Sequence, residues 1–347
     1  MALPNLLFSH LFRNFANQMR VTLYIMRTRF SIAIVACLLS GMCVKAGAQE
    51  SQTAYNFLRL PVSTHAAALG GDNITLVEDD WALTFHNPAL LTTVSDKTIG
   101  LGYMNYMEGV NTASAAFNRT VGERASWAAE GQFIDYGKMK EVDENNVQSG
   151  EFQARDIALG GSFAYLLTNR IAGGITARLI SSTIGQYNSM AVGVDLGLNY
   201  FDPDRLWSVS AVAKNLGGQI KAYNDEYERM PFDLQLGVSK QMQNMPIRFH
   251  LTLVDLNHWG YRFANHMVLG VDAMLSKQVW IAAGYNLRRA NEMKIASGSG
   301  SDDDESAHNA GLSLGAGLQL QRFKLGVSYA KYHVSSRSLM LNVAYSL

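Results

Sequence analysis

Apolar and polar residues alternate with a period of two along most of the chain beyond Lys97, and this pattern predicts a fold made of strands. In residues 190–200, one face holds methionine, valine, leucine and tyrosine, and the other holds alanine, glycine, aspartate and asparagine. Successive side chains of a strand point to opposite sides of a sheet. A single segment of this kind fits a soluble sandwich as well as a membrane barrel, so the number and length of the segments must decide.

The alternating segments are long and even in number, which favours a barrel that crosses a membrane. Most run ten residues or more, whereas sandwich strands average about 5–6 residues and tilted spanning strands need about 9–11. Hydrocarbon offers no partner to a free N–H or C=O group, so a spanning sheet must close on itself. We predict an all-β fold, a transmembrane antiparallel β-barrel of about 14 strands. The predicted strands are 97–107, 111–120, 124–136, 153–166, 170–183, 187–200, 206–216, 232–241, 246–256, 264–275, 278–288, 309–321, 322–333 and 337–347.

The composition supports a surface that largely avoids water. Charged residues make up 17% of the chain and hydrophobic residues 48%, whereas soluble domains carry about 25% charged residues. No run of about 18 apolar residues follows the N-terminal segment, so spanning helices are not expected. Lys+Arg and Asp+Glu both number 29. This balance argues against a nucleic-acid partner, which requires a basic excess.

The predicted connections are long at one end of the barrel and short at the other. The long ones, 137–152, 217–231 and 288–308, all fall at the same end. This asymmetry is typical of surface loops and periplasmic turns in outer-membrane barrels. With fourteen strands, both ends of the sheet face the periplasm, and we expect Leu347 to lie beside the strand 97–107.

Residues 26–48 have the features of a cleaved secretory signal. A short basic start precedes a mostly apolar stretch, which ends in an alanine-glycine-alanine cleavage site at Ala48. This order of regions is typical of export signals. We expect cleavage between Ala48 and Gln49, and we interpret residues 1–25 as a dispensable extension. The protein is therefore expected in the outer membrane of a Gram-negative envelope.

Both cysteines of the chain, Cys37 and Cys43, lie in this N-terminal segment. Removal of the signal would leave no disulfide, thiolate nucleophile or cysteine metal site. An alternative is that Cys37 belongs to a lipobox-like sequence and becomes a lipidated N-terminus.

Charged residues recur on the presumed inward faces of the strands. Arg178, Asp195 and Lys214 lie on three successive strands and are predicted to form a ladder in the lumen. Cross-strand pairs of this kind stabilise a sheet by about 0.2–1 kcal/mol each. We favour pairing among these groups or with the segment before the barrel, and a pore lining is the alternative. The same faces carry Glu130, Asp156 and Asp272.

The chain contains no constellation that predicts enzyme activity, a cofactor or a metal. Asp79 and Asp80 have no nearby His, Ser or Lys in sequence to complete a catalytic set, so we expect helix capping or ion pairing. His86-Asn87-Pro88 is expected to start a turn. The acidic stretch Ser297–Glu305 lacks the ligand spacing of a calcium loop. Zinc, phosphate-loop and nucleophile-elbow motifs are also absent.

An ordered set of motifs resembles the PorV/PorQ family of outer-membrane proteins, and within it the PorQ branch. The resemblance covers residues 53–347, and only the stretch Ser297–Glu305 departs from it. The motifs are Tyr55–Pro61, His65–Gly71, Asp79–Asp80, His86–Leu90, Asn215–Gly218, Asp255–Trp259, Gly284–Asn286 and Tyr345–Leu347.

The resemblance implies a barrel similar to that of long-chain fatty-acid transporters, with residues 49–96 folded as a lumenal plug before the barrel at 97–347. It also implies a role in the type IX secretion system. The expected partners are outer-membrane lipid and the components of a cell-surface attachment complex: a PorZ-like surface protein, a sortase-like protein and a PorV-like barrel.

The sequence therefore leads to an anchoring hypothesis, in which the barrel holds the attachment complex that processes and retains secreted cargo. Three aromatic residues in or beside the outer loops, Tyr223, Trp259 and Tyr261, are candidate partner contacts, because aromatics are enriched in binding hot spots. An interfacial belt would use the same residue types. The alternative hypothesis is a channel or transporter for small hydrophobic molecules, which needs an apolar lumenal pocket and a kinked strand. A soluble periplasmic β-protein is a third possibility.

Overall fold

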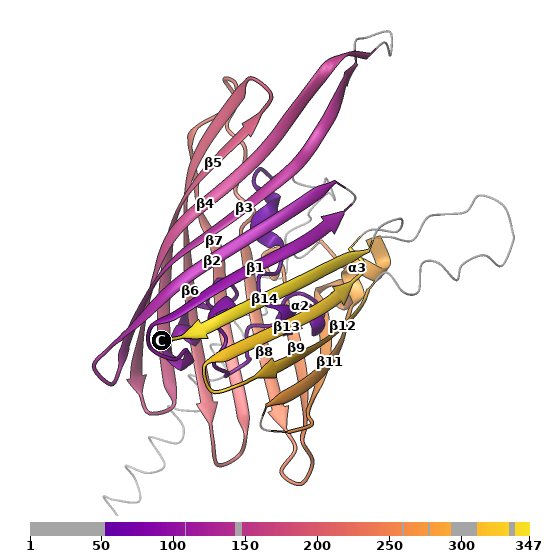
Figure 1. Cartoon of the computed structure of the whole chain (residues 1–347). Helices are drawn as coiled ribbons and strands as arrows, with labels where there is room; N and C mark the ends of the chain where they lie inside the picture. The colour runs from indigo at the N-terminus through magenta and orange to yellow at the C-terminus, as the bar shows by residue number, and fades with distance from the viewer. Residues whose placement is uncertain are drawn as a thin grey trace, which may run out of the picture. The chain divides into compact units, whose positions relative to one another are not determined.

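A single antiparallel sheet closes into a barrel of fourteen strands, as the alternation predicts (Figure 1). The structure is a computed structural model, and it describes residues 53–107, 109–142, 148–258, 260–276, 278–292, 311–332 and 337–347. Among the described residues, no helix is both long and apolar enough to cross a bilayer. The cleavage site at Ala48 and Gln49, Trp259 and the stretch Ser297–Glu305 lie outside these residues.

Each strand pairs with its neighbours in sequence, and β14 pairs with β1 to close the ring. That last pairing runs from Thr98 opposite Ser346 to Asn105 opposite Leu339. The strands are β1 (Thr98–Met107), β2 (Val110–Val121), β3 (Ala125–Val142), β4 (Gln148–Thr168), β5 (Ile171–Ile184), β6 (Tyr187–Asp202), β7 (Trp207–Lys221), β8 (Asp233–Gln241), β9 (Ile247–Leu253), β10 (Met267–Met274), β11 (Val279–Asn286), β12 (Leu312–Gln319), β13 (Phe323–Ala330) and β14 (Ser338–Ser346).

The two faces of the sheet are the reverse of those in a soluble protein. Large apolar side chains point outward, and Leu101 and Leu179 are each 60% exposed. Polar side chains point inward, and Thr176 and Asn199 are 0% and 5% exposed. This arrangement is typical of a barrel whose outer surface meets lipid.

Short turns join the strands at one end of the barrel, and the long connections lie at the other, as predicted. Two predicted connections are partly wrong, however, because β3 and β4 continue through much of 137–152 and β7 continues into 217–231. Lys140 still pairs with Glu151 in this region. Charged residues occur on both strands there, so the apolar alternation is lost although the hydrogen-bonded ladder continues.

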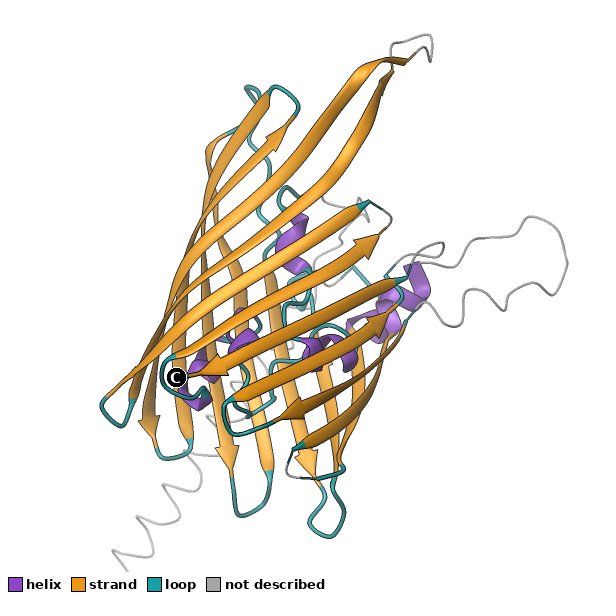
Figure 2. Ribbon diagram, viewed as in Figure 1, coloured by secondary structure: helices purple, strands orange, loops and turns teal. Residues whose placement is uncertain are grey.

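The described part of the plug, residues 53–96, lies inside the ring of strands (Figure 2). Its helices are short, and polar side chains cap three of them at the start. Ser63, Asp80 and Asn87 each accept a hydrogen bond from a backbone N–H in the first turn, which satisfies a donor that the helix leaves free. The helices are η1 (Asn56–Arg59), α2 (Thr64–Ala68), η2 (Trp81–Phe85) and η3 (Pro88–Thr93), of which the η elements are 3₁₀-helices.

The plug runs through the barrel from one end to the other. At the long-connection end, Thr53 forms a β-bridge with Arg229, which lies between β7 and β8. At the short-turn end, the backbone oxygen of Lys97 accepts a hydrogen bond from the N–H of Leu347 at 3.2 Å. The chain therefore enters β1 at the same end at which it finishes.

Glycines on the inner wall let the plug backbone approach the strands closely. A Cβ atom at Gly284 of β11 would lie 2.1 Å from the carbonyl carbon of Leu69. A Cβ atom at Gly174 of β5 would lie 2.4 Å from the carbonyl carbon of Pro88. Both contacts are with plug backbone, which cannot move aside as a flexible side chain would. The spacing of plug and wall therefore depends on the absence of a side chain at these positions.

We expect the substitution Gly284→Ala to displace the plug and to lower stability by about 1–3 kcal/mol, as overpacked interiors do. The measurement is the thermal unfolding midpoint of the purified protein in detergent. Gly218→Ala in β7 is the matched control, because a Cβ atom there meets no other atom within 4 Å. Equal unfolding midpoints for the two variants would show that the plug does not rest on Gly284.

Candidate functional site

Five charged or titratable residues join the plug to the part of the wall that β9 and β10 form. We call His65, Glu78, Arg248, His250 and Asp272 the plug–wall cluster. His65 Nδ1 lies 2.9 Å from Glu78 Oε2, and both residues belong to the plug. Arg248 Nη2 lies 2.6 Å from Asp272 Oδ2, and both residues belong to the wall.

Contacts across the boundary complete the plug–wall cluster. His65 Nε2 lies 3.4 Å from Asp272 Oδ2, and the guanidinium of Arg248 donates to Glu78 Oε1. On the wall itself, His250 Nε2 lies 2.8 Å from Asp272 Oδ1. Each carboxylate therefore contacts at least one group on its own side and one group across the boundary.

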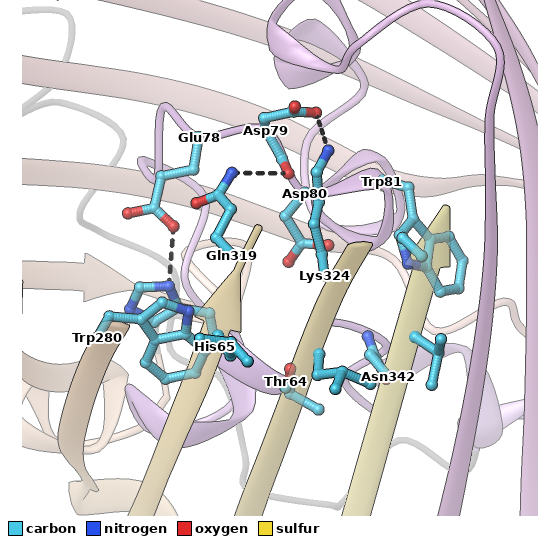
Figure 3. Close-up of a pocket in the computed structure, with 15 residues that line it drawn as sticks. Thr64, His65, Glu78, Asp79, Asp80, Trp81, Trp280, Gln319, Lys324 and Asn342 are labelled. Atoms are coloured by element: carbon cyan, nitrogen blue, oxygen red, sulfur yellow. Dashed lines mark hydrogen bonds and ion pairs between the residues drawn. The ribbon is translucent and has the colours of Figure 1, made fainter. Parts of the chain in front are cut away.

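Local structure fixes the position of His65. Ser63 caps α2 and also donates its hydroxyl to Asp80 at 2.7 Å, so the start of the helix is held within the plug. The imidazole of His65 then stacks on the indole of Trp280 in β11, with ring centroids 3.7 Å apart and planes 2° from parallel. Figure 3 shows this stack beside the Glu78 carboxylate. The imidazole therefore has a fixed orientation toward both carboxylates.

The two plug residues of the cluster, His65 and Glu78, stabilise each other's charged forms. Burial alone lowers the pKa of His65, but the carboxylates of Glu78 and Asp272 raise it to about 9. Burial alone raises the pKa of Glu78, but His65 and Arg248 lower it to about 2. Both plug residues are therefore ionised at neutral pH, and each holds the other in its charged form.

The plug–wall cluster does not fit a metal ion, although its ligand types suggest one. Donor atoms of His65, Glu78 and Asp272 lie within 4.8 Å of one another. However, Arg248 contacts both carboxylates, so a cation already stands where a metal would bind. Protonated His65 is a second cation, and two positive groups then balance two carboxylates.

A small cavity lies next to the plug–wall cluster, between the plug and strands β12–β14 (Figure 3). Its volume is about 40 Å³, which is room for a few water molecules at most. Lys324 Nζ lies 2.5 Å from Asp79 Oδ1 on its border, and Gln319 donates to the backbone oxygen of Asp79 at 3.5 Å. This cavity is too small to hold a drug-sized ligand.

The predicted ladder residues lie inward, but they do not form one continuous row. Arg178 Nη2 lies 2.6 Å from Asp195 Oδ2, and Arg178 Nε lies 3.3 Å from Glu130 Oε1. Lys214 is also buried, but it pairs in register with Asp233 of β8. A bulge in β7 that begins at Lys214 shifts the pairing of β7 with β6. Lys214 therefore does not continue the row that Arg178 and Asp195 form.

The other inward carboxylates have separate partners. Asp156 accepts hydrogen bonds from the hydroxyls of Tyr136, at 2.8 Å, and Ser182. Asp272 belongs to the plug–wall cluster and lies far along the barrel wall from Arg178, because β10 and β5 are not neighbours. The inward charges therefore form local groups.

The candidate aromatic contacts have mixed surroundings. Tyr223 is partly buried and donates its hydroxyl to Ser182, and its ring lies 6.4 Å from that of Tyr55 in the plug. Tyr261 makes a cation–π contact with Arg288, whose guanidinium lies 5.0 Å from the ring centroid. Tyr223 therefore faces the lumen, and Tyr261 is engaged within the long-connection end. Trp259 is outside the described residues.

The polar residues of the plug have structural surroundings. Asp80 caps η2 by accepting from the N–H of Ala82 at 3.0 Å. His86 Nε2 accepts from the N–H groups of Val62 and Ser63, at 3.2 and 3.3 Å. Burial holds the pKa of His86 well below its usual value, and nearby Lys214 lowers it further. A neutral imidazole is the form that can accept these hydrogen bonds.

Comparisons with known proteins identify the fold. No protein-family model and no curated protein sequence matches the chain. Among solved structures, the Pseudomonas putida toluene transporter TodX is 14% identical and has a TM-score of 0.51, and the match covers 82% of this chain and 96% of that one. The CymD monoaromatic hydrocarbon channel is 13% identical, with a TM-score of 0.52 and coverages of 83% and 98%. A Pseudomonas aeruginosa FadL homologue is 11% identical, with a TM-score of 0.50 and coverages of 82% and 98%.

These matches extend over nearly the whole of each neighbour, so the chain shares their complete barrel fold. The identities are too low to carry more than the fold. The expectation of a barrel similar to that of fatty-acid transporters is therefore confirmed.

We expect the plug–wall cluster to make stability depend on pH. Because the pKa of His65 is raised from 6.5 to about 9, its protonated form stabilises the fold fully below pH 6.5. This contribution is lost as the pH rises through about 9, and it amounts to roughly 3 kcal/mol at most. The measurement is the unfolding midpoint in detergent between pH 6 and 10, for the wild type and for His65→Gln.

The wild type should lose stability across this range more steeply than His65→Gln. His258→Gln is the control, because His258 lies in the β9–β10 connection and has a lowered pKa, so it is neutral over most of the range. A wild-type slope that survives in His65→Gln would rule out His65 as the titrating group.

Proposed function

We propose that this protein is an outer-membrane channel that passes small hydrophobic molecules, with the plug closing its lumen at rest. The barrel fold that it shares with a toluene transporter and a monoaromatic hydrocarbon channel supports this function. Neither of these neighbours is described as an enzyme. As is typical of outer-membrane barrels, we place the short turns on the periplasmic side and the long connections on the outside of the cell.

The observation that carries the proposal is an apolar patch of the inner wall that the plug covers. Phe57 and Leu58 of η1 pack in one buried cluster with wall residues of β3–β6 and of the β7–β8 connection. If η1 and the following helix α2 move together away from the wall, the patch exposes an apolar site inside the lumen. A hydrophobic molecule can then replace the two plug side chains. The wall residues of the patch are Ile134, Ala158, Ile180, Ala191 and Met230.

A strand irregularity near the apolar patch adds to the support. The pairing of β6 with β7 shifts register between Val194 and Leu196, and Asn215 has a left-handed φ of 58°. The Asp195 carboxylate accepts the N–H of Asn215 at 2.7 Å, so a side chain replaces part of the backbone ladder. A bulge locally disrupts strand pairing and bends the strand, and this supports the proposal because transport through the wall requires a kinked strand.

The test locks the plug with a disulfide. A Cβ atom at Gly326 of β13 would lie 3.1 Å from Cβ of Thr64 in α2, close to the ≈ 3.5–4.5 Å of a disulfide. Thr64→Cys combined with Gly326→Cys should therefore cross-link plug and wall after a small adjustment. The chain has no other cysteine beyond Cys43, so the new bond has no competitor in the barrel.

We expect Gram-negative cells that lack a hydrocarbon channel to take up labelled toluene faster when they express the wild type. The oxidised double variant should show only background uptake, and a reducing agent should restore it. The two single variants are the controls. Background uptake by the wild type would refute the transport function, and equal uptake by oxidised and reduced double variants would refute a moving plug.

A second candidate is the anchoring role implied by the resemblance to the PorV/PorQ family. The projecting β3–β4 hairpin favours it (Figure 1). These are the longest strands, and a groove of about 840 Å³ lies between the hairpin and the β5–β6 turn. Exposed charges such as the Lys138–Glu151 pair, at 3.4 Å, line this groove. A groove that combines these charges with apolar residues such as Phe152 and Tyr187 is suited to a protein partner.

We expect a chain in which a short turn replaces residues 138–153 to lose its attachment-complex partners in a pull-down from detergent-solubilised membranes. The control replaces the turn 242–246 at the opposite end of the barrel. Recovery of the same partners with both chains would contradict a docking role for the hairpin. Failure to recover a partner even with the wild type would remove the anchoring role itself.

A further inference from the structure

An apolar groove crosses the outer surface of the barrel from β7 to β12. Its volume is about 620 Å³, within the ≈ 300–1,000 Å³ typical of small-molecule sites. It is a feature of the outward face, separate from the lumen and from the plug. Its apolar lining includes Val238, Phe249, Leu251, Leu269, Val271 and Leu312.

The groove is hollow because a small side chain lies on its floor. Ala283 of β11 faces outward opposite Val271 of β10 and Leu314 of β12, and the outward positions on either side of it in β11 carry the larger residues Ile281 and Tyr285. Tyr285 and Leu312 form the border at the long-connection end. A larger residue at position 283 would therefore fill the groove without touching the plug.

A cation marks the other end of the groove. Lys240, near the end of β8, lines the groove together with Trp207 at the start of β7. The ammonium group lies 5.1 Å from the centroid of the indole ring and donates to the backbone oxygen of Arg205 in the short turn. Lysine and tryptophan are typical of the boundary between hydrocarbon and headgroups.

The dimensions and the charge fit one amphipathic occupant. Strands lie about 4.8 Å apart, so the path from β7 to β12 covers roughly 24 Å. The groove crosses the tilted strands, so this length runs around the outer face of the barrel within its apolar belt. An extended apolar chain matches the lining, and a negative group matches Lys240.

We propose that the groove binds a phospholipid of the leaflet at the short-turn end, with an acyl chain along the groove and the phosphate at Lys240. The site rests on the outer-membrane placement of the barrel but not on transport. The bound lipid would hold strands β8–β11, which are among the shortest of the sheet, against the surrounding bilayer.

The experiment titrates dioleoyl-phosphatidylglycerol into the detergent-solubilised full-length mature protein and counts bound lipids by native mass spectrometry. The wild type should retain one lipid more tightly than the rest. Lys240→Ala should weaken that site about fivefold, as expected for one lysine at an anionic surface. Ala283→Trp should abolish the site, because the indole fills the groove and keeps an apolar outward face.

Lys140→Ala is the control, because Lys140 is exposed on the β3–β4 hairpin and far from the groove. Unchanged lipid affinity in both Lys240→Ala and Ala283→Trp would overturn the proposal. A dimer that Ala283→Trp abolishes, with no lipid bound, would assign the groove to a second copy of the chain and also overturn it. Toluene uptake by the same variants separates the two proposals, since lipid binding without uptake refutes only the transport function.

Discussion

An open strand edge exposes a row of N–H and C=O groups, and hydrocarbon offers these groups no partner. The pairing of β14 with β1 removes the last such edge in this chain. Every other feature follows from that closure. A closed sheet has only an inner and an outer face, so the outer face becomes apolar and the polar side chains turn inward. The barrel then encloses a lumen that strand side chains alone do not fill.

The plug fills the lumen, and two kinds of contact hold it there. Glycines such as Gly284 bring the plug backbone against the wall, which contributes close packing without a directional bond. The plug–wall cluster contributes charged contacts, for example between His65 and Asp272. Close packing and charge act at different places along the plug, so one part of it can loosen while the rest stays in place.

The sequence was sufficient to predict the barrel, because the alternation that defines a strand is local. The same alternation predicted that the side chains of Arg178 and Asp195 point into the lumen, and both are buried there. The register of Lys214 did not follow, because a bulge inserts a residue in β7 and changes the partner on the neighbouring strand. A bulge depends on contacts across strands, and alternation along one strand does not report them.

The plug–wall cluster was harder to predict, because it joins residues that are distant in sequence. Arg248 and His250 alternate with apolar residues in β9, so their inward direction was readable. Their partners His65 and Glu78 belong to a segment without periodicity, and no local rule indicates which strand it meets. The ends of β3 and β4 were missed for a different reason. Outside the lipid, both faces of a strand can be polar, so the signal disappears before the strand does.

The division of charges in the plug–wall cluster bears on whether the plug can move. Breaking a buried ion pair by removing one partner costs about 3–5 kcal/mol, because a charge is left uncompensated. Here the plug carries both His65 and Glu78, which contact each other at 2.9 Å. The wall carries both Arg248 and Asp272, which contact each other at 2.6 Å.

Within the plug–wall cluster, separation of plug and wall would therefore leave one cation and one carboxylate on each side, already paired. It would break the interactions across the boundary, such as the 3.4 Å approach of His65 to Asp272. By contrast, Arg178, Glu130 and Asp195 all belong to the wall, and they stay together whatever the plug does. The plug–wall cluster thus keeps its charges balanced in both positions of the plug, and the charge cost of opening comes instead from pairs such as Lys324 of the wall with Asp79 of the plug, which would be separated.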